Sequence, residues 1–260
     1  MTMLKAIIFD LDGTLLDWRL CTVDYRDYER DHLGRVYAYV HNHIHPLNDE
    51  NHFYDSMQVT MMRLWTDARN TMQAPHIGQV LVDTLEQHGV PRHLLDLDVC
   101  MQAFEPELIP GVMLFPDILA ELDNLRRYGL RFGLATNASQ PMSMRDSELK
   151  TVGLLDYFDD GCRLSAADAG YLKPHPQIFS AVMNNLGVAA EEAIFIGDNL
   201  EADIRGAQRV GMKAVLREYN EPFDPGVYSG AEIIPDAKIK TLRDLFPVLD
   251  IWYPGWRNGA

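Results

Sequence analysis

The sequence predicts an α/β fold in which a parallel β-sheet is flanked by helices, with an all-helical segment inserted after the first strand. Apolar runs of strand length at 6–9, 130–135 and 193–196 are separated by stretches with helical spacing. Strands that alternate with helices favour a parallel sheet with right-handed crossovers. Between about residues 16 and 107, by contrast, the apolar residues recur at helical spacing and no run indicates a strand.

The first strand, at 6–9, ends in two carboxylates, Asp10 and Asp12, and Gly13 then gives the backbone freedom to turn. The helical insert follows. Its apolar stripes predict four helices, at about 25–40, 53–68, 80–85 and 97–104. We interpret these stripes, including their methionines, as core packing.

The rest of the chain supplies the remaining strands and the helices between them. We expect strands at 130–135, 161–164, 193–196 and 213–216, and a short last strand at 231–234. We expect helices at 116–129, 144–151, 176–186, 201–210 and 241–249. The predicted organisation is an α/β core domain of residues 1–16 plus 108–260 and a helical domain of residues 17–107.

Composition excludes several classes of partner. The 260 residues carry a formal net charge of −15, which argues against a nucleic-acid partner or an anionic membrane surface. No apolar run is long enough for a bilayer span, and the chain enters its first strand without a signal segment. Cys21, Cys100 and Cys162 are far apart and show no metal-ligand spacing, so we expect reduced thiols in a cytoplasmic protein. The sequence leaves a monomer and a homodimer equally open.

The residues that carry chemistry lie in four short segments. At 4–14, LKAIIFDLDGT delivers two acids to the end of a buried strand, which is costly unless a cation or a reaction uses them. Thr136-Asn137, Lys173-Pro174 and the stretch from Gly197-Asp198 to Asp203 follow in order. Together the four segments resemble the motifs of the haloacid dehalogenase (HAD) superfamily, in which most members are Mg²⁺-dependent phosphatases. The resemblance implies a Rossmann-like parallel sheet and a helical cap of the C1 type.

Asp10 and Asp12 are the candidate nucleophile and the candidate general acid and base. A carboxylate can attack phosphorus and form an aspartyl-phosphate, the role that the resemblance implies for Asp10. Asp12 would protonate the leaving oxygen and then activate water. Superfamily dehalogenases lack an acid at the position of Asp12, so its presence favours phosphate transfer. Gly13 and Thr14 would support the turn.

Thr136, Asn137 and Lys173 are the candidate phosphate-binding residues. A hydroxyl and free N–H groups at a strand end suit a phosphate oxygen, although a Thr-Asn pair there is also a common helix cap. Asn137 would help to position the substrate or the nucleophile. The ammonium of Lys173 would offset the charges of Asp10 and of the phosphate, and its alternative is a solvated surface lysine.

The expected cofactor is Mg²⁺, because a few hard oxygen ligands beside a phosphate suit this ion. The resemblance implies that the side chains of Asp10 and Asp198 and the backbone carbonyl of Asp12 bind it. Asp203 would support the site without binding the ion, or would stabilise the N-terminus of the following helix.

A second possible metal site consists of histidines in the insert. Four of them occur close together in the sequence: His41, His43, His45 and His52. Spacing alone is weak evidence for a transition-metal site, and solvated histidines in a loop are the better interpretation.

The insert also discriminates among HAD reactions, because residues 17–107 contain no lysine. Superfamily phosphonatases need a cap lysine for a Schiff base, and phosphosugar mutases tend to use cap cations. We therefore predict a Mg²⁺-dependent phosphomonoesterase of a small phosphorylated metabolite whose identity the sequence does not give. The alternatives are a phosphosugar mutase, a dehalogenase, or a catalytically silent binding or scaffold protein on the same fold.

Overall fold

A six-stranded parallel sheet forms the centre of the computed structural model, which describes residues 3–218 and 233–258. The strand order is β5-β4-β1-β6-β7-β8, and each neighbouring pair is parallel, so the predicted α/β class is confirmed. These strands are β1 (Ala6–Phe9), β4 (Arg131–Thr136), β5 (Arg163–Ser165), β6 (Ala193–Gly197), β7 (Lys213–Arg217) and β8 (Ala237–Ile239).

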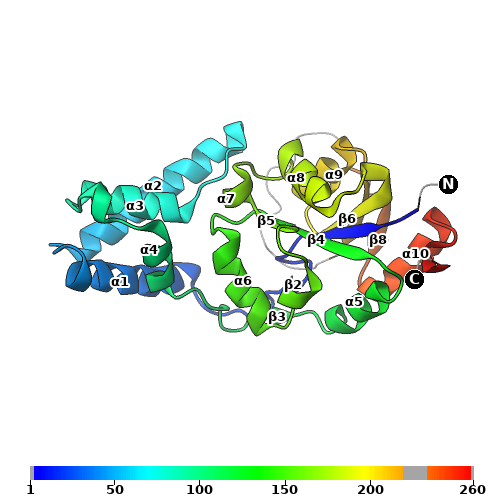
Figure 1. Ribbon diagram of the computed structural model, residues 1–260, viewed down its shortest axis with the longest axis horizontal. Helices are drawn as coiled ribbons and strands as arrows, with labels where there is room; N and C mark the ends of the chain where they lie inside the picture. The colour runs from blue at the N-terminus through cyan, green and yellow to red at the C-terminus, as the bar shows by residue number, and fades with distance from the viewer. Residues whose placement is uncertain (1–2, 219–232, 259–260) are drawn as a thin grey trace.

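Helices cover both faces of this sheet (Figure 1). In β1, Ile7 and Phe9 point into one hydrophobic cluster while Ala6 and Ile8 point into the other. Burial on both faces explains why the strands read as continuous apolar runs. The first face is covered by α5 (Ile118–Arg126), α6 (Met142–Thr151) and α10 (Leu245–Trp252), and the second by α8 (Pro176–Leu186) and α9 (Gly206–Arg209).

The first four α-helices of the chain, which all follow β1 and precede β4, pack around a hydrophobic core of their own. Figure 1 shows them grouped to one side of the sheet. Met57, Met61 and Met101 are buried in this core, which confirms that these methionines are packing residues. The helices are α1 (Tyr25–His43), α2 (Glu50–Thr71), α3 (Ile77–Gln87) and α4 (Leu97–Phe104).

The helical insert joins the rest of the protein through backbone contacts. Ala74 N donates to Gly170 O at 3.1 Å, and Leu172 N donates to Met72 O at 2.8 Å. Where the chain leaves and re-enters the α/β part, β2 (Leu16–Asp17) pairs antiparallel with β3 (Met113–Leu114). The sequence reading had no strand at residue 16 and was wrong there, because a two-residue strand is too short to show a period.

The last strand also differs from its prediction. It is Ala237–Ile239, whereas residues 231–234 were expected. Residues 231 and 232 lie outside the described part of the chain, and residues 233–235 are not in a strand. Two isoleucines suggested the strand, but Ile234 is 68% exposed and Pro235 has no N–H to donate to a sheet.

Two helical segments depart in detail from the expected pattern. The helix expected at 201–210 is a π-helical segment, η4 (Leu200–Arg205), that continues into α9. A short helix, α7 (Ala166–Ala169), follows β5 and was not predicted. Within the described ranges, none of the helices combines the length and apolarity that a membrane span requires.

Candidate active site

The register of three central strands brings the candidate residues to one edge of the sheet. Phe9 at the end of β1 pairs with Leu134 on β4 and with Ile196 on β6. Asp10 follows β1 directly, Thr136 is the last residue of β4, and Asp198 follows β6 directly, so all three lie at the carboxyl ends of parallel strands. In open α/β sheets, ligands bind at this edge, next to the point where the strand order reverses its direction.

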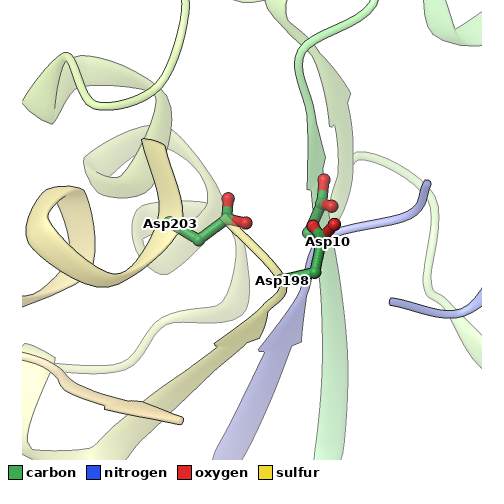
Figure 2. A group of neighbouring side chains, drawn as sticks. All are labelled: Asp10, Asp198 and Asp203. Atoms are coloured by element: carbon green, nitrogen blue, oxygen red, sulfur yellow. The ribbon is translucent and has the colours of Figure 1, made fainter. Parts of the chain in front are cut away.

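Three carboxylates gather at this edge. One oxygen each of Asp10, Asp198 and Asp203 lies within 4.8 Å of the others, and no comparable group of His, Cys, Asp or Glu occurs elsewhere in the described residues. Figure 2 shows Asp203 pointing from its helical segment toward the strand ends that carry Asp10 and Asp198. Asp10 is 6% exposed and Asp203 is fully buried, so bulk water can hardly solvate negative charges on these side chains.

Lys173 supplies one positive charge to this acidic cluster. Its Nζ lies 2.6 Å from Asp10 Oδ1 and 2.7 Å from Asp203 Oδ1. The lysine is 4% exposed, so the alternative of a solvated surface lysine is wrong. One ammonium serves a cluster of three acidic side chains, so ionising all three would leave an excess of negative charge at a buried site.

The pKa values reflect this excess. Burial raises the pKa of Asp10 to about 7, although Lys173 opposes the change. Burial, followed by repulsion from Asp10 and Asp203, raises the pKa of Asp198 to about 9. Burial lowers the pKa of Lys173, but the carboxylates of Asp10 and Asp203 outweigh it and hold that pKa above its ordinary value. A cluster of oxygen donors with surplus negative charge is suited to hold a hard divalent cation.

Two glycines let the backbone approach this site. Gly13 has a φ of 79°, a conformation that residues with a Cβ rarely adopt. A Cβ on Gly197 would lie 2.3 Å from Oδ2 of Asp203, so only glycine leaves room for that carboxylate. The same Oδ2 accepts a hydrogen bond from Asn199 N at 3.0 Å. Asp203 is therefore fixed by both Lys173 and the start of η4.

The supporting threonine and asparagine residues have distinct partners. Thr14 Oγ1 donates to Asp10 Oδ2 at 3.4 Å, and Thr136 Oγ1 donates to Asp12 Oδ2 at 3.4 Å. Asn137 is bonded twice to the main chain of Lys173: its Nδ2 donates to the carbonyl at 3.1 Å, and its Oδ1 accepts from the N–H at 2.7 Å. Asn137 therefore positions the Lys173 segment.

Asp12 has a partner that the sequence analysis missed. Nη2 of Arg145 on α6 donates to both oxygens of Asp12, at 2.9 and 3.0 Å, and Trp18 Nε1 donates to Oδ1 at 3.1 Å. Arg145 is 5% exposed and lies 3.4 Å from Glu148. Both residues sit on the buried face of α6 among apolar side chains. The sequence did contain one signal for this contact, because Arg145 and Glu148 are oppositely charged, lie three residues apart and fall on the apolar face of a predicted helix.

The four histidines of the insert lie in separate contacts. His41 Nδ1 is 3.0 Å from Leu47 O, and His45 Nδ1 is 2.9 Å from Pro46 O. The ring of His43 packs on Tyr39, and the ring of His52 packs on His88 with centroids 4.8 Å apart. These contacts give each ring a structural neighbour and do not bring the four together.

Comparison with known proteins gives a consistent family. The model of haloacid dehalogenase-like hydrolases matches residues 4–211. A ribulose-1,5-bisphosphate 5-phosphatase from Halopiger xanaduensis is 28% identical over 94% of this chain and 98% of that protein. A phosphoglycolate phosphatase from Salmonella typhi is 28% identical over 95% of this chain and 93% of that protein.

Solved structures agree on the fold. A structure described as a 2-haloacid dehalogenase from Pseudomonas syringae pv. tomato has a TM-score of 0.62 and 27% identity, and covers 96% of this chain and all of that one. The family model spans most of the chain, including all four motif segments. The chain belongs to the haloacid dehalogenase-like hydrolase family.

Proposed function

We propose that this protein is a Mg²⁺-dependent phosphomonoesterase that acts on a small phosphorylated metabolite through an aspartyl-phosphate on Asp10. The observation that carries the proposal is the pairing of buried Asp10 with Lys173 at 2.6 Å, beside Asp198 and Asp203 at the carboxyl edge of the sheet. A carboxyl group at position 12, in its protonated form, adds the proton donor that ester cleavage needs. The names of the relatives, which are phosphatases of small phosphate esters, support the same activity.

In the first step, a carboxylate oxygen of Asp10 attacks phosphorus and the bond from phosphorus to the ester oxygen breaks. Asp12 gives its proton to that oxygen, so the substrate leaves as an alcohol. In the second step, Asp12 accepts a proton from water while the water oxygen attacks phosphorus. Phosphate departs, the Asp10 carboxylate is regenerated, and Asp12 is protonated again.

Lys173 and Thr136 prepare the site for the phosphoryl group. The Lys173 ammonium offsets the charge of Asp10, which lets a buried carboxylate approach an anionic substrate. Thr136 ends β4 beside Asp12 and would contact a phosphoryl oxygen. The side chains of Asp10 and Asp198 and the backbone carbonyl of Asp12 would hold Mg²⁺. When bound, the ion supplies positive charge beside the phosphoryl oxygens.

We further propose that residues 17–107 form a C1-type cap domain and that residues 1–16 and 108–260 form the core domain. The separate hydrophobic core of helices α1 to α4 supports this division. Backbone contacts from Met72 and Ala74 to residues 170 and 172 place the α2–α3 connection against the chain that leads to Lys173. Side chains of the cap would therefore select the alcohol part of the substrate.

A dehalogenase is the second candidate, because a structure with that description shares 27% identity and a TM-score of 0.62 with this chain. One experiment separates the two activities. Phosphate release from p-nitrophenyl phosphate and a panel of phosphorylated metabolites is measured with Mg²⁺ and with EDTA, beside halide release from 2-chloropropionate. We expect Mg²⁺-dependent phosphate release that Asp10→Asn abolishes. Halide release without phosphate release would refute the phosphatase assignment, and neither activity would favour a silent scaffold.

A further inference from the structure

We infer that Arg145 is a positioning residue that orients the carboxylate of Asp12 for proton transfer, and that Glu148 holds Arg145 in place. This inference rests on the proposed function, because Arg145 acts through Asp12. The residue lies in no segment that resembles a family motif, and for this part of the chain the sequence predicted only a helix at 144–151.

The contacts fix the Asp12 carboxylate on both of its oxygens. Oδ1 accepts from Trp18 at 3.1 Å and from Arg145 at 2.9 Å, while Oδ2 accepts from Arg145 at 3.0 Å and from Thr136 at 3.4 Å. A carboxylate held in this way cannot rotate freely. When Asp12 is protonated, one of its oxygens becomes a donor and gives up one of these contacts, while the remaining contacts still fix the plane of the carboxyl group. Proton transfer depends on that geometry, because donor and acceptor must lie within hydrogen-bond reach and in line.

Exposure separates the residue that meets the substrate from the residue behind it. The side chain of Asp12 is 36% exposed, whereas that of Arg145 is 6% exposed. A substrate entering the site can therefore reach Asp12, while Arg145 lies behind it. Its guanidinium acts on the carboxylate and not on the incoming molecule.

A purely structural role would not explain why Arg145 is buried, because its burial is energetically unfavourable. Its Nε is buried and has no hydrogen-bond partner among the described residues, and a buried donor left without an acceptor is unfavourable. Burial lowers the pKa of Arg145, but Asp12 and Glu148 outweigh it and keep the guanidinium charged. Glu148 is itself buried, and its Oε2 lies 3.4 Å from Nη2 of Arg145. Such a buried charge, tolerated next to a reactive carboxylate, points to function.

The test uses two substrates that differ in their need for a proton. An alkyl phosphate such as β-glycerophosphate must leave as an alcohol, whereas p-nitrophenolate leaves readily as an anion. The ratio of turnover to Michaelis constant, kcat/KM, reports the first chemical step for each. We expect Arg145→Met to lower kcat/KM for the alkyl phosphate by about 10–100-fold, part of the effect of losing a general acid, and for p-nitrophenyl phosphate by no more than about threefold.

Further variants make the result specific. Asp12→Asn should lower kcat/KM for the alkyl phosphate relative to p-nitrophenyl phosphate even more strongly. Adding Arg145→Met to Asp12→Asn should cause little further loss, because Arg145 acts only through the Asp12 carboxyl group. Arg145→Lys keeps a cation and should restore part of the alkyl phosphate rate. Glu148→Gln should give a smaller selective loss, and it tests the inference if Arg145→Met does not fold.

Arg163→Met is the matched control. Arg163 on β5 has a side chain that is 9% exposed, and its Nε pairs at 2.8 Å with Asp146, which follows Arg145 on α6, without a contact to Asp12. We expect it to change stability without changing the ratio between the two substrates.

Three results would overturn the role of Arg145. Arg145→Met could slow both substrates equally, which indicates a structural role, or could match Arg163→Met. It could also weaken only a substrate whose leaving group bears a carboxylate, such as phosphoglycolate, through a higher KM, which indicates direct substrate binding. The proposed function fails separately, if the wild-type protein hydrolyses none of these esters.

Discussion

Replacing Asp198 by asparagine tests the electrostatics of the acidic cluster without an activity assay. The raised pKa of Asp198, about 9 against an ordinary 3.8, means that the folded protein resists ionisation of this side chain. Asparagine has nearly the same shape and no charge. The substitution should therefore stabilise the metal-free protein at alkaline pH.

The size of the effect follows from proton linkage. Between pH 3.8 and 9 the folded state holds a proton that the unfolded chain releases. Protonated Asp198 therefore makes its full contribution to the free energy of unfolding below pH 3.8. As the pH rises from 3.8 toward 9, the free energy of unfolding falls by about 1.4 kcal/mol for each pH unit. At pH 8 the loss is on the order of 5 kcal/mol, and Asp10 shares part of it because the two carboxylates repel. We expect Asp198→Asn to gain about 2–5 kcal/mol at pH 8 and less at pH 6.

Urea unfolding followed by tryptophan fluorescence, in EDTA and then in excess Mg²⁺, measures this directly. Mg²⁺ should stabilise the wild-type protein by mass action and should have little effect on the variant. Asp250→Asn is the control, because Asp250 lies at the surface beside Arg257, which lowers its pKa, so the change should not stabilise the protein. The reasoning fails if Asp198→Asn is no more stable than the wild type in EDTA at pH 8, or if both gain equally from Mg²⁺.

Two further substitutions test how the cluster is held together. Lys173→Met leaves the buried carboxylates of Asp10 and Asp203 without their ammonium and should cost about 3–5 kcal/mol in denaturant unfolding. Adding Asp203→Asn should recover part of that loss, and no recovery would show that the three charges are not coupled. Gly197→Ala puts a Cβ 2.3 Å from Oδ2 of Asp203 and should lower stability by about 1–3 kcal/mol. Gly34→Ala in α1 meets only the Glu50 side chain at 3.2 Å and should be neutral or stabilising, so equal losses would argue against the predicted clash.

The parts of the fold that the sequence predicted are those with a strong local signal. Strands buried on both faces, such as β1 and β6, give continuous apolar runs that end in polar residues. The helices of the insert show a clear period, because each turns one face toward a shared core. The family and its hydrolase class followed from the four motif segments, and the family comparison confirms them.

The parts that could not be predicted depend on tertiary contacts. The ribbon of β2 and β3 consists of two-residue strands that pair across about a hundred residues of chain, and neither has a local pattern. The last strand was misplaced because Ile233 and Ile234 looked like a strand, while the true strand at 237–239 contains a lysine. Its position at the edge of the sheet tolerates that polar residue.

The site was predicted unevenly for a similar reason. Asp10, Asp198 and Lys173 were identified because their segments resemble known motifs, and the structure brings these side chains together, although their roles remain predictions. Asn137 and Arg145 act on their neighbours through contacts that span 36 and 133 positions of sequence. Such contacts leave no mark on a local pattern, so the geometry was needed to find them.

Trapping the covalent intermediate tests the account most directly. The protein is mixed with a phosphate ester carrying a ³²P-labelled phosphoryl group, quenched with acid within one turnover, and digested for peptide mapping. We expect label on the peptide that contains Asp10, released by hydroxylamine as an acyl-phosphate would be, and no label on Asp10→Asn. Turnover of the ester with no labelled peptide, or with label on another residue, would contradict Asp10 as the nucleophile.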